Sequence, residues 1–413
     1  MSKQTPEGVV EVDERRAGGA LRLTQLDGLR GVGAFVVVLY HCVLVVPAMA
    51  QLLSIGPYPA HTPAAFSVQW WLDRTPLRLV WGGHEAVLVF FVLSGFVLTL
   101  PLRPGAQGGR GWSAYYVRRL LRLYVPVWGA LVLAYALASA VTRDTSFGST
   151  WLRVHPQPHV ATAVKDAILV RGVSNLDSPL WSLQWEVLFS LLLPVFVVIL
   201  WAIRVERWWR PAIVLLAMAS VLAEVPAVRH ALPQAWITDG LLQYMPVFVI
   251  GMVLCLVRAR LSGLWQAIRP PMRTAIIVAV VVLVPARSYV STGPGAEREA
   301  VTALLGFVAV LAVAVLVVLA LVSSRVSSAL RTRPMQWLGT RSFSIYLIHE
   351  PIVVSAALLL HADSPWPWAL IAVVVIAVSL LMAEGFYRVV ERPAHLLSRA
   401  VGRRVQGRRP VAA

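Results

Sequence analysis

The sequence is poor in cysteine and in charged residues. Only two of its 413 residues are cysteines, Cys42 and Cys255, and both lie in apolar stretches. A disulfide framework or a cysteine-based zinc site needs several cysteines at defined spacing, so neither is present. Charged residues make up 14% of the chain and hydrophobic residues 58%. This composition excludes an ordinary soluble domain.

The first 22 residues lack the apolar core of a secretory signal peptide and instead mix charged residues with glycine. We predict three parts: a disordered cytoplasmic tail at 1–22, a single membrane domain at 23–394, and a basic cytoplasmic tail at 395–413. The membrane domain has no internal repeat and no inverted-repeat pattern typical of transporters.

Apolar runs long enough to cross a bilayer recur along the whole chain. They predict an all-α, polytopic membrane protein with about ten transmembrane helices. The expected spans are 31–50, 86–101, 123–142, 181–203, 211–228, 237–257, 274–290, 301–323, 342–360 and 367–388.

The net charge is +17, from 37 Lys and Arg against 20 Asp and Glu. Nucleic-acid binding is excluded as its cause, because the arginines cluster between spans rather than on one soluble face. If the N-terminus is cytoplasmic, most of them lie on the cytoplasmic side, as the positive-inside rule requires. We predict a multi-pass protein of the cell membrane with both termini cytoplasmic and long outer loops at about 51–85 and 143–180.

His155 and His159, in the second outer loop, are spaced like a pair of metal ligands. No cysteine or carboxylate follows at ligand spacing, so we expect a solvated loop and no metal site.

Arg30 and His41 lie in one apolar run, eleven residues apart. At about 100° per residue the two side chains share a helix face to within roughly 20°, and the rise between them is about 16 Å. Ionisable residues inside a membrane are costly and usually functional. The alternative is an arginine that reaches the interface and a histidine that hydrogen-bonds within the helix bundle.

The run Leu-Asp-Gly-Leu-Arg-Gly, with ten residues between its Arg30 and His41, resembles the signature of the type-3 membrane acyltransferases. Four later stretches resemble the same family in the same order: Phe90–Phe96, Arg118–Arg119, Trp181–Glu186 and Tyr346–Pro351. The resemblance spans about residues 22 to 394. It implies an enzyme that moves an acyl group from acyl-CoA to a sugar or another hydroxylated acceptor.

For this chemistry His41 is the expected general base, because attack on a thioester requires removal of the hydroxyl proton. Counted from an inner boundary near Gly31, it lies about 15 Å deep, close to the middle of the bilayer. Glu186, about 10 Å below the outer surface, is the expected catalytic partner that orients His41 or stabilises its charge. The alternative for Glu186 is a carboxylate stabilised by a helix N-terminus and lipid headgroups.

Arg30, Arg118 and Arg119 are expected on the cytoplasmic side, where guanidinium groups can bind the phosphates of CoA. Asp27 is placed to orient Arg30. The alternative is that these arginines only follow the charge asymmetry of a membrane protein.

Four further residues are candidates for substrate binding or support. Ser94, in a Ser-Gly pair, also suits close helix packing. Glu85 stands one turn before Leu88 and Val89, where family members often carry a polar residue. His349 and Glu350 precede a proline that loosens their helix. A buried hydrogen-bonded pair is the alternative for these last two.

The predicted function is therefore an integral-membrane O-acyltransferase that transfers an acyl group, most simply acetyl, from acyl-CoA to a sugar hydroxyl of a cell-envelope or lipid-linked glycan. A glycosylated or macrolide secondary metabolite is the alternative acceptor. A transporter for an acidic solute is the alternative from another class. No permanently bound cofactor and no metal are expected; the expected partners are acyl-CoA, the hydroxylated acceptor and the bilayer.

Overall fold

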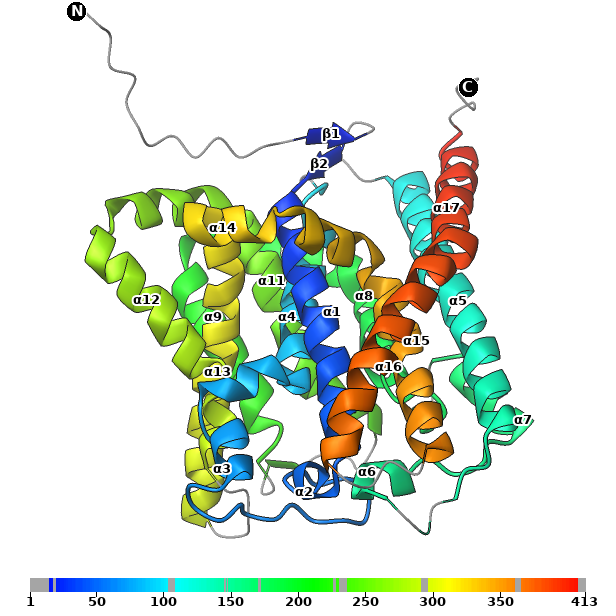
Figure 1. The fold of residues 1–413 in the computed structure, drawn as a ribbon. Coiled ribbons are helices and arrows are strands. Elements are labelled where there is room, and N and C mark those ends of the chain that lie inside the picture. Colours follow the sequence, from blue (N-terminus) through cyan, green and yellow to red (C-terminus); the bar gives the residue numbers. More distant parts are fainter. Residues whose placement is uncertain are drawn as a thin grey trace, which may run out of the picture.

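The computed structural model describes residues 15–17, 20–102, 108–144, 146, 148–169, 172–225, 228–229, 236–290, 296–360 and 365–407. Long helices run side by side between two faces, and the first and last described elements, β1 and α17, lie at the same face (Figure 1). We name this the terminal face. The opposite face carries the short helices α2, α3, α6 and α7 (Pro47–Ala50, Val68–Asp73, Thr150–Arg153 and Val160–Asp166) and is named the loop face.

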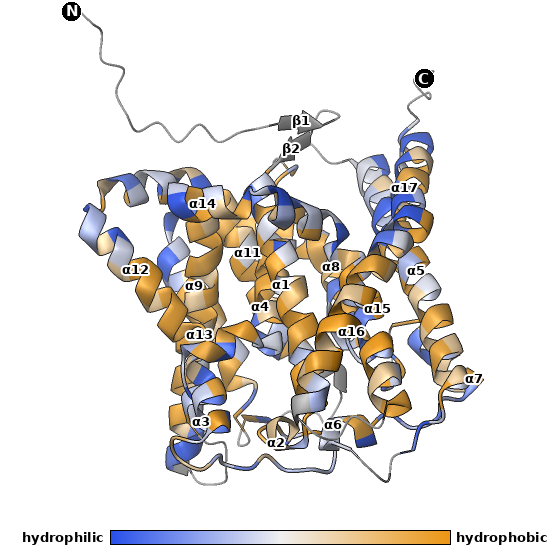
Figure 2. Cartoon of the chain, viewed as in Figure 1, coloured by the Kyte–Doolittle hydropathy of each residue, from blue (hydrophilic) through white to orange (hydrophobic). Residues whose placement is uncertain are grey.

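Each of the ten predicted spans falls on a helix. These helices are α1 (Thr24–Leu44), α4 (Gly83–Thr99), α5 (Gly109–Ala140), α8 (Leu180–Ala202), α9 (Trp209–Leu222), α11 (Trp236–Ala267), α12 (Pro270–Leu283), α13 (Ala296–Val322), α15 (Arg333–Leu359) and α16 (Pro365–Phe386). Within the described residues, seven helices are long and apolar enough to cross a membrane, and α4, α9 and α12 are shorter apolar helices. Hydrophobic residues fill the middle of the bundle and polar residues lie near its two faces (Figure 2). The predicted class of polytopic helical membrane protein is confirmed.

The remaining elements are short. They are β1 (Arg15–Ala17), β2 (Ala20–Arg22), η1 (Pro76–Val80), η2 (Val205–Arg207), η3 (Ala286–Tyr289), α14 (Ser324–Leu330), the π-helical turn η4 (Tyr387–Glu391) and α17 (Arg392–Val405). β1 pairs with β2 as a small antiparallel hairpin inside the stretch predicted to be a disordered tail.

Several predicted spans were wrong in extent, and the largest difference is in α5. The span expected at 123–142 is part of α5, which begins at Gly109 and is 32 residues long. Arg118 and Arg119 therefore lie inside a helix rather than in a loop. The physical reason is that α17 packs along the N-terminal part of α5. There the aliphatic part of Arg118 fits against Gly402, where a β-carbon would come within 2.4 Å of that side chain.

Glycines allow two pairs of helices to touch along their backbones. A β-carbon on Gly31 of α1 would lie 2.4 Å from the amide nitrogen of Gly339 in α15. A β-carbon on Gly95 of α4 would lie 1.9 Å from the carbonyl oxygen of Phe248 in α11. Gly95 therefore serves helix packing, as its Ser-Gly context suggested. The α1–α15 contact sets the register of the site described next.

Candidate active site

His41 of α1 and His349 of α15 form a buried pair. Nδ1 of His41 lies 2.9 Å from Nε2 of His349, across 308 residues of sequence. His41 is 7% exposed and His349 is fully buried.

The proton positions of this pair follow from its backbone contacts. Nδ1 of His349 lies 2.9 Å from the carbonyl oxygen of Ile345, so it carries the proton and donates it, because a carbonyl only accepts. In a neutral ring Nε2 of His349 is then an acceptor, and Nδ1–H of His41 donates to it. Nδ1 of His41 also lies 3.1 Å from the carbonyl oxygen of Val37. Nε2 of His41 is left with a lone pair that can take a proton.

The depth predicted for His41 was wrong. α1 begins at Thr24, not near Gly31, and ends at Leu44. The helix therefore begins and ends about six residues earlier in the sequence than the predicted span 31–50. His41 lies in the last turn of α1, towards the loop face, rather than at the middle of the helix.

Two aromatic rings lie against His41. The ring of Tyr40 meets the imidazole edge-on with 5.0 Å between centroids. The ring of Trp151, in α6, lies 5.3 Å from it and is 4% exposed. Because α6 belongs to the segment 143–180, this long loop folds over the histidine pair.

Glu350 ties the same loop to α15. Its Oε1 lies 2.9 Å from Nε2 of His155 and accepts a 2.5 Å hydrogen bond from the Ser178 hydroxyl. Its Oε2 accepts a 2.7 Å bond from the Ser178 amide. Glu350 is fully buried and His155 is 1% exposed. The expectation that His155 lies in a solvated loop was wrong, because the buried carboxylate holds it; His159 is exposed, as expected.

Glu186 does not contact His41. It forms an ion pair with Arg119 and accepts a 3.1 Å hydrogen bond from Ser94. Glu186 lies eight residues after Ser178, the residue bonded to Glu350, so helix geometry carries it about 12 Å further towards the terminal face. The predicted partnership with His41 is therefore replaced by the contact with His349. Ser94 takes part in this ion-pair network beside Gly95.

The arginines predicted to bind CoA separate into different environments. Arg119 is bonded to Glu186 and, at 2.9 Å, to the hydroxyl of Ser190. Arg118 packs against α17. Arg30 and Arg122 are electrostatic neighbours, and Glu186 and Glu391 belong to the same neighbourhood. That Asp27 orients Arg30 stays a prediction.

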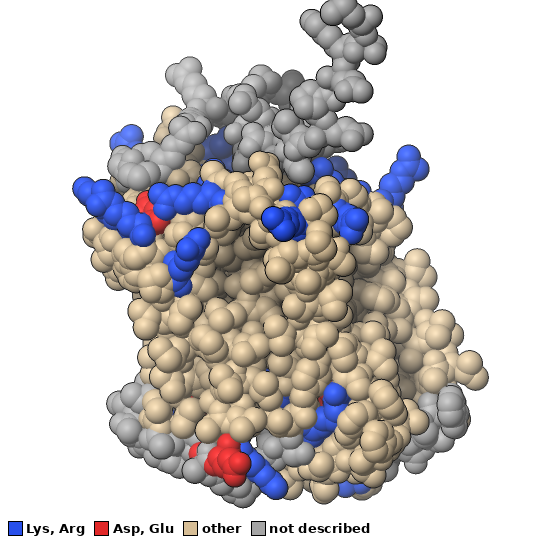
Figure 3. Space-filling view, turned by 90° about the vertical axis from the view of Figure 1, so that its left-hand side faces the viewer, with Lys and Arg blue, Asp and Glu red and all other residues tan. Residues whose placement is uncertain are grey.

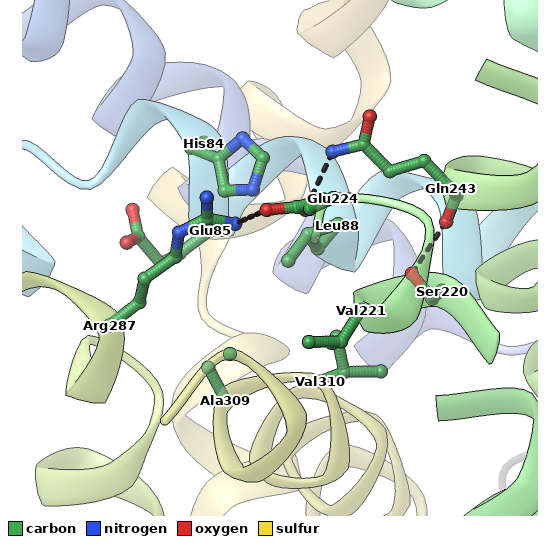
Figure 4. Close-up of a pocket in the computed structure, with 11 residues that line it drawn as sticks. His84, Glu85, Leu88, Ser220, Val221, Glu224, Gln243, Arg287, Ala309 and Val310 are labelled. Carbon is green, nitrogen blue, oxygen red and sulfur yellow. Dashed lines mark hydrogen bonds and ion pairs between the residues drawn. The ribbon is translucent and has the colours of Figure 1, made fainter. Parts of the chain in front are cut away.

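Glu85 lines a small cavity between α4, α9, α11 and α13, together with His84 and Leu88 (Figure 4). On its polar side Arg287 pairs with Glu224, which also accepts a 2.7 Å hydrogen bond from Gln243. Figure 4 shows the valines and Ala309 lining the opposite side. The cavity volume is about 20 Å³, room for about one water molecule and not for a sugar.

In the part of the chain that the structure describes, no group of three or more His, Cys, Asp or Glu side chains is placed to hold a metal ion.

Comparison with known proteins identifies the family. A family model described as an acyltransferase domain matches residues 23–384. The chain belongs to this acyltransferase family. Membership of this family favours acyl transfer over the alternative of a transporter for an acidic solute.

Curated relatives are similar over most of this chain. YrhL of Bacillus subtilis is 26% identical over 339 residues, which are 76% of this chain and 50% of YrhL. Acyltransferase MdmB of Streptomyces mycarofaciens is 25% identical over 80% of this chain and 84% of its own length. Peptidoglycan O-acetyltransferase OatA of Listeria monocytogenes is 25% identical over 76% of this chain and 51% of its own length. The chain thus spans about half the length of YrhL and OatA. No solved structure matches.

Proposed function

We propose that this acyltransferase moves an acyl group, most simply acetyl, from acyl-CoA to a sugar hydroxyl of a cell-envelope or lipid-linked glycan. The observation that carries the proposal is the His41–His349 contact, which leaves Nε2 of His41 free to accept a proton in a buried site.

The step needs one base and no redox partner. The acceptor oxygen attacks the thioester carbonyl while Nε2 of His41 takes the hydroxyl proton, a contribution of about 10²–10⁴-fold. The tetrahedral intermediate then collapses, the carbon–sulfur bond breaks, and the imidazolium returns its proton to the departing thiolate. His349 positions His41. Glu350 lies within electrostatic reach and stabilises the transient positive charge.

The donor is proposed to enter from the terminal face. Figure 3 shows Lys and Arg side chains gathered in a band there, and few at the loop face. By the positive-inside rule the terminal face is then cytoplasmic, which is where acyl-CoA is found. Arg30 and Arg122 are the best-placed phosphate ligands, since Arg119 and Arg118 are engaged elsewhere.

The acceptor is proposed to enter from the loop face, where the segment 143–180 covers His41. The similarity to OatA, which is named a peptidoglycan O-acetyltransferase, favours an envelope glycan. A secondary metabolite is the second candidate. MdmB, which this chain covers over 84% of its length, is named an acyltransferase without a stated acceptor.

The test is transfer of label from acetyl-CoA in detergent or vesicles, with an envelope glycan fraction and a small-metabolite fraction offered separately. We expect the glycan fraction to be labelled. His41→Ala and His41→Gln should both lower the rate by at least about 10²-fold while acyl-CoA still binds, since Gln keeps hydrogen bonding but takes no proton at neutral pH. A His41→Gln protein with near wild-type activity would rule out the base assignment.

A further inference from the structure

The guanidinium of Arg143 is buried and has no hydrogen-bond partner among the described residues. Arg143 begins the long loop after α5, and the residue is 6% exposed. Among the described residues, none accepts a hydrogen bond from its Nε, Nη1 or Nη2, and all three atoms are shielded from solvent. Arginine cannot lose its proton in a protein, so this charge is permanent.

The position of Arg143 is nevertheless well defined. Its backbone amide donates to Oε1 of Gln157 at 3.2 Å, and Nε2 of Gln157 donates to the carbonyl oxygen of Ala138 at 2.7 Å. Gln157 therefore holds the start of the loop against the end of α5. An arginine fixed in this way without an acceptor is costly unless something binds it.

The neighbouring charges do not neutralise it. Glu350 is the carboxylate that acts on Arg143 electrostatically. Its oxygens, however, are occupied by His155 and Ser178. Nδ1–H of His155 donates to the carbonyl oxygen of Trp151 at 2.8 Å, so a single further proton joins His155 to Glu350. Wherever that proton lies, the His155–Glu350 pair has no net charge.

Asp177 does not supply the missing negative charge. It is fully buried, and neither of its oxygens has a hydrogen-bond partner among the described residues. Burial, together with the nearby Glu350 and Asp166 carboxylates, raises the pKa of Asp177 well above its usual range. The raised pKa makes Asp177 a weaker source of negative charge than an ordinary aspartate, while the positive charge on Arg143 is permanent.

We propose that Arg143 binds an oxyanion, a carboxylate or a phosphate carried by the acceptor, at the loop face, within electrostatic reach of Glu350, which is also an electrostatic neighbour of His41. A planar guanidinium binds such groups through two parallel hydrogen bonds. Because its nitrogens are shielded, the ligand enters only when neighbouring side chains move aside. This inference rests on the proposed function for the identity of the ligand, not for the existence of the anion site.

Binding is tested first without any activity assay. The purified protein is melted in formate or inorganic phosphate, against chloride at equal ionic strength. We expect each oxyanion to raise Tm by on the order of 2 °C or more, in a saturable way. Arg143→Gln should abolish the response to formate. Asp177→Asn, which keeps a neutral side chain of the same shape, should retain it.

A second control distinguishes anion binding at Arg143 from anion binding at the terminal face. Phosphate can also bind the arginines of the terminal face, so Arg30→Gln should keep the formate response while Arg143→Gln loses it. A wild-type protein without an oxyanion-specific rise, or an Arg143→Gln protein with the full rise, would overturn the proposal.

Stability in chloride alone distinguishes a ligand-binding arginine from a structural one. Removing a buried, unpaired charge should leave Tm unchanged or higher, so Arg143→Met is expected to melt at or above the wild-type temperature. A fall of several degrees would show that Arg143 holds the fold together, and would contradict the proposal.

The source of the oxyanion is tested with pairs of acceptors that differ only in a carboxylate and its methyl ester. Wild-type protein should prefer the acid, and Arg143→Gln should reduce that preference by about 10-fold or more, the factor for a charged hydrogen bond. An unchanged preference would contradict acceptor recognition by Arg143. If no acceptor is labelled at all while the formate response persists, the proposed function fails and the anion site stands.

Discussion

Both rings of the histidine pair are fixed by their own helices. Each Nδ1 faces the backbone carbonyl four residues earlier, Val37 for His41 and Ile345 for His349. Helix geometry thus determines which nitrogen of each ring carries the proton. It leaves one nitrogen of the pair free, so a defined proton acceptor arises without a contacting carboxylate.

His349 can be tested as a positioning residue. His349→Phe removes the acceptor for Nδ1–H of His41, so kcat should fall by about 10-fold or more with little change in the KM for acyl-CoA. His349→Gln keeps an acceptor oxygen and should recover part of the rate. Kinetics of purified variants decide, with matched circular dichroism spectra as the folding control. Equal loss in both variants, or a loss confined to KM, would count against positioning.

Arg30 is expected to anchor the charged end of CoA. Arg30→Lys keeps the charge but loses the planar fork, and should weaken acyl-CoA binding by about 1–3 kcal/mol. Arg118→Lys is the matched control, because Arg118 packs against α17 and should affect binding little. Calorimetry on the purified proteins measures both. Unchanged affinity in Arg30→Ala would make Arg30 a structural residue.

Among the helices, the contact between α1 and α15 governs the site, because it brings His41 opposite His349. Gly31→Ala would place a methyl group 2.4 Å from the backbone of Gly339, so the helices must separate. We expect a loss of about 1–3 kcal/mol in stability, as for other overpacked contacts, together with reduced transfer.

The control for that substitution is Gly263→Ala in α11, where a β-carbon meets nothing within 4 Å. It should leave the melting temperature unchanged or slightly higher, since Ala is the better helix former. Equal melting temperatures for Gly31→Ala and Gly263→Ala would contradict the close α1–α15 contact.

Helices could be predicted from sequence because their signal is local: an apolar run needs no knowledge of its neighbours. The pairing of side chains between helices could not be predicted in this way. The helical period places Arg30 and His41 on one face, but it does not say which helix that face meets. Glu186 was therefore paired with His41 although it lies beside Arg119. The burial of His155 could not be predicted either. Its partner Glu350 lies 195 residues further along the chain, so nothing in the local sequence indicates the contact.

At the scale of the whole molecule, the charge asymmetry predicts the orientation. Ser146 lies exposed in the loop after α5 and Ser262 near the terminal-face end of α11. Ser146→Cys should react with an impermeant thiol reagent in intact cells, and Ser262→Cys only after the cells are opened. Cys42 and Cys255 are buried and give little background. The reverse pattern would invert the proposed entry faces of donor and acceptor.

In the proposed function, a donor from one side of the membrane meets an acceptor from the other. The proposal assigns donor binding at the terminal face to Arg30 and Arg122, and acceptor binding at the loop face to the segment 143–180. His41 lies in the last turn of α1, nearer the loop face, so the proposal requires the acyl end of the donor to reach far into the molecule from the terminal face.

The most direct test is sided transfer in sealed vesicles that hold the purified protein in one orientation. Labelled acetyl-CoA is supplied only at the terminal face and envelope glycan only at the loop face, and label on the glycan is measured over time. We predict labelled glycan with wild-type protein, and a rate at least about 10²-fold lower with His41→Gln. Labelling by His41→Gln at the wild-type rate, or by the wild type only when acetyl-CoA is supplied at the loop face, would contradict the account.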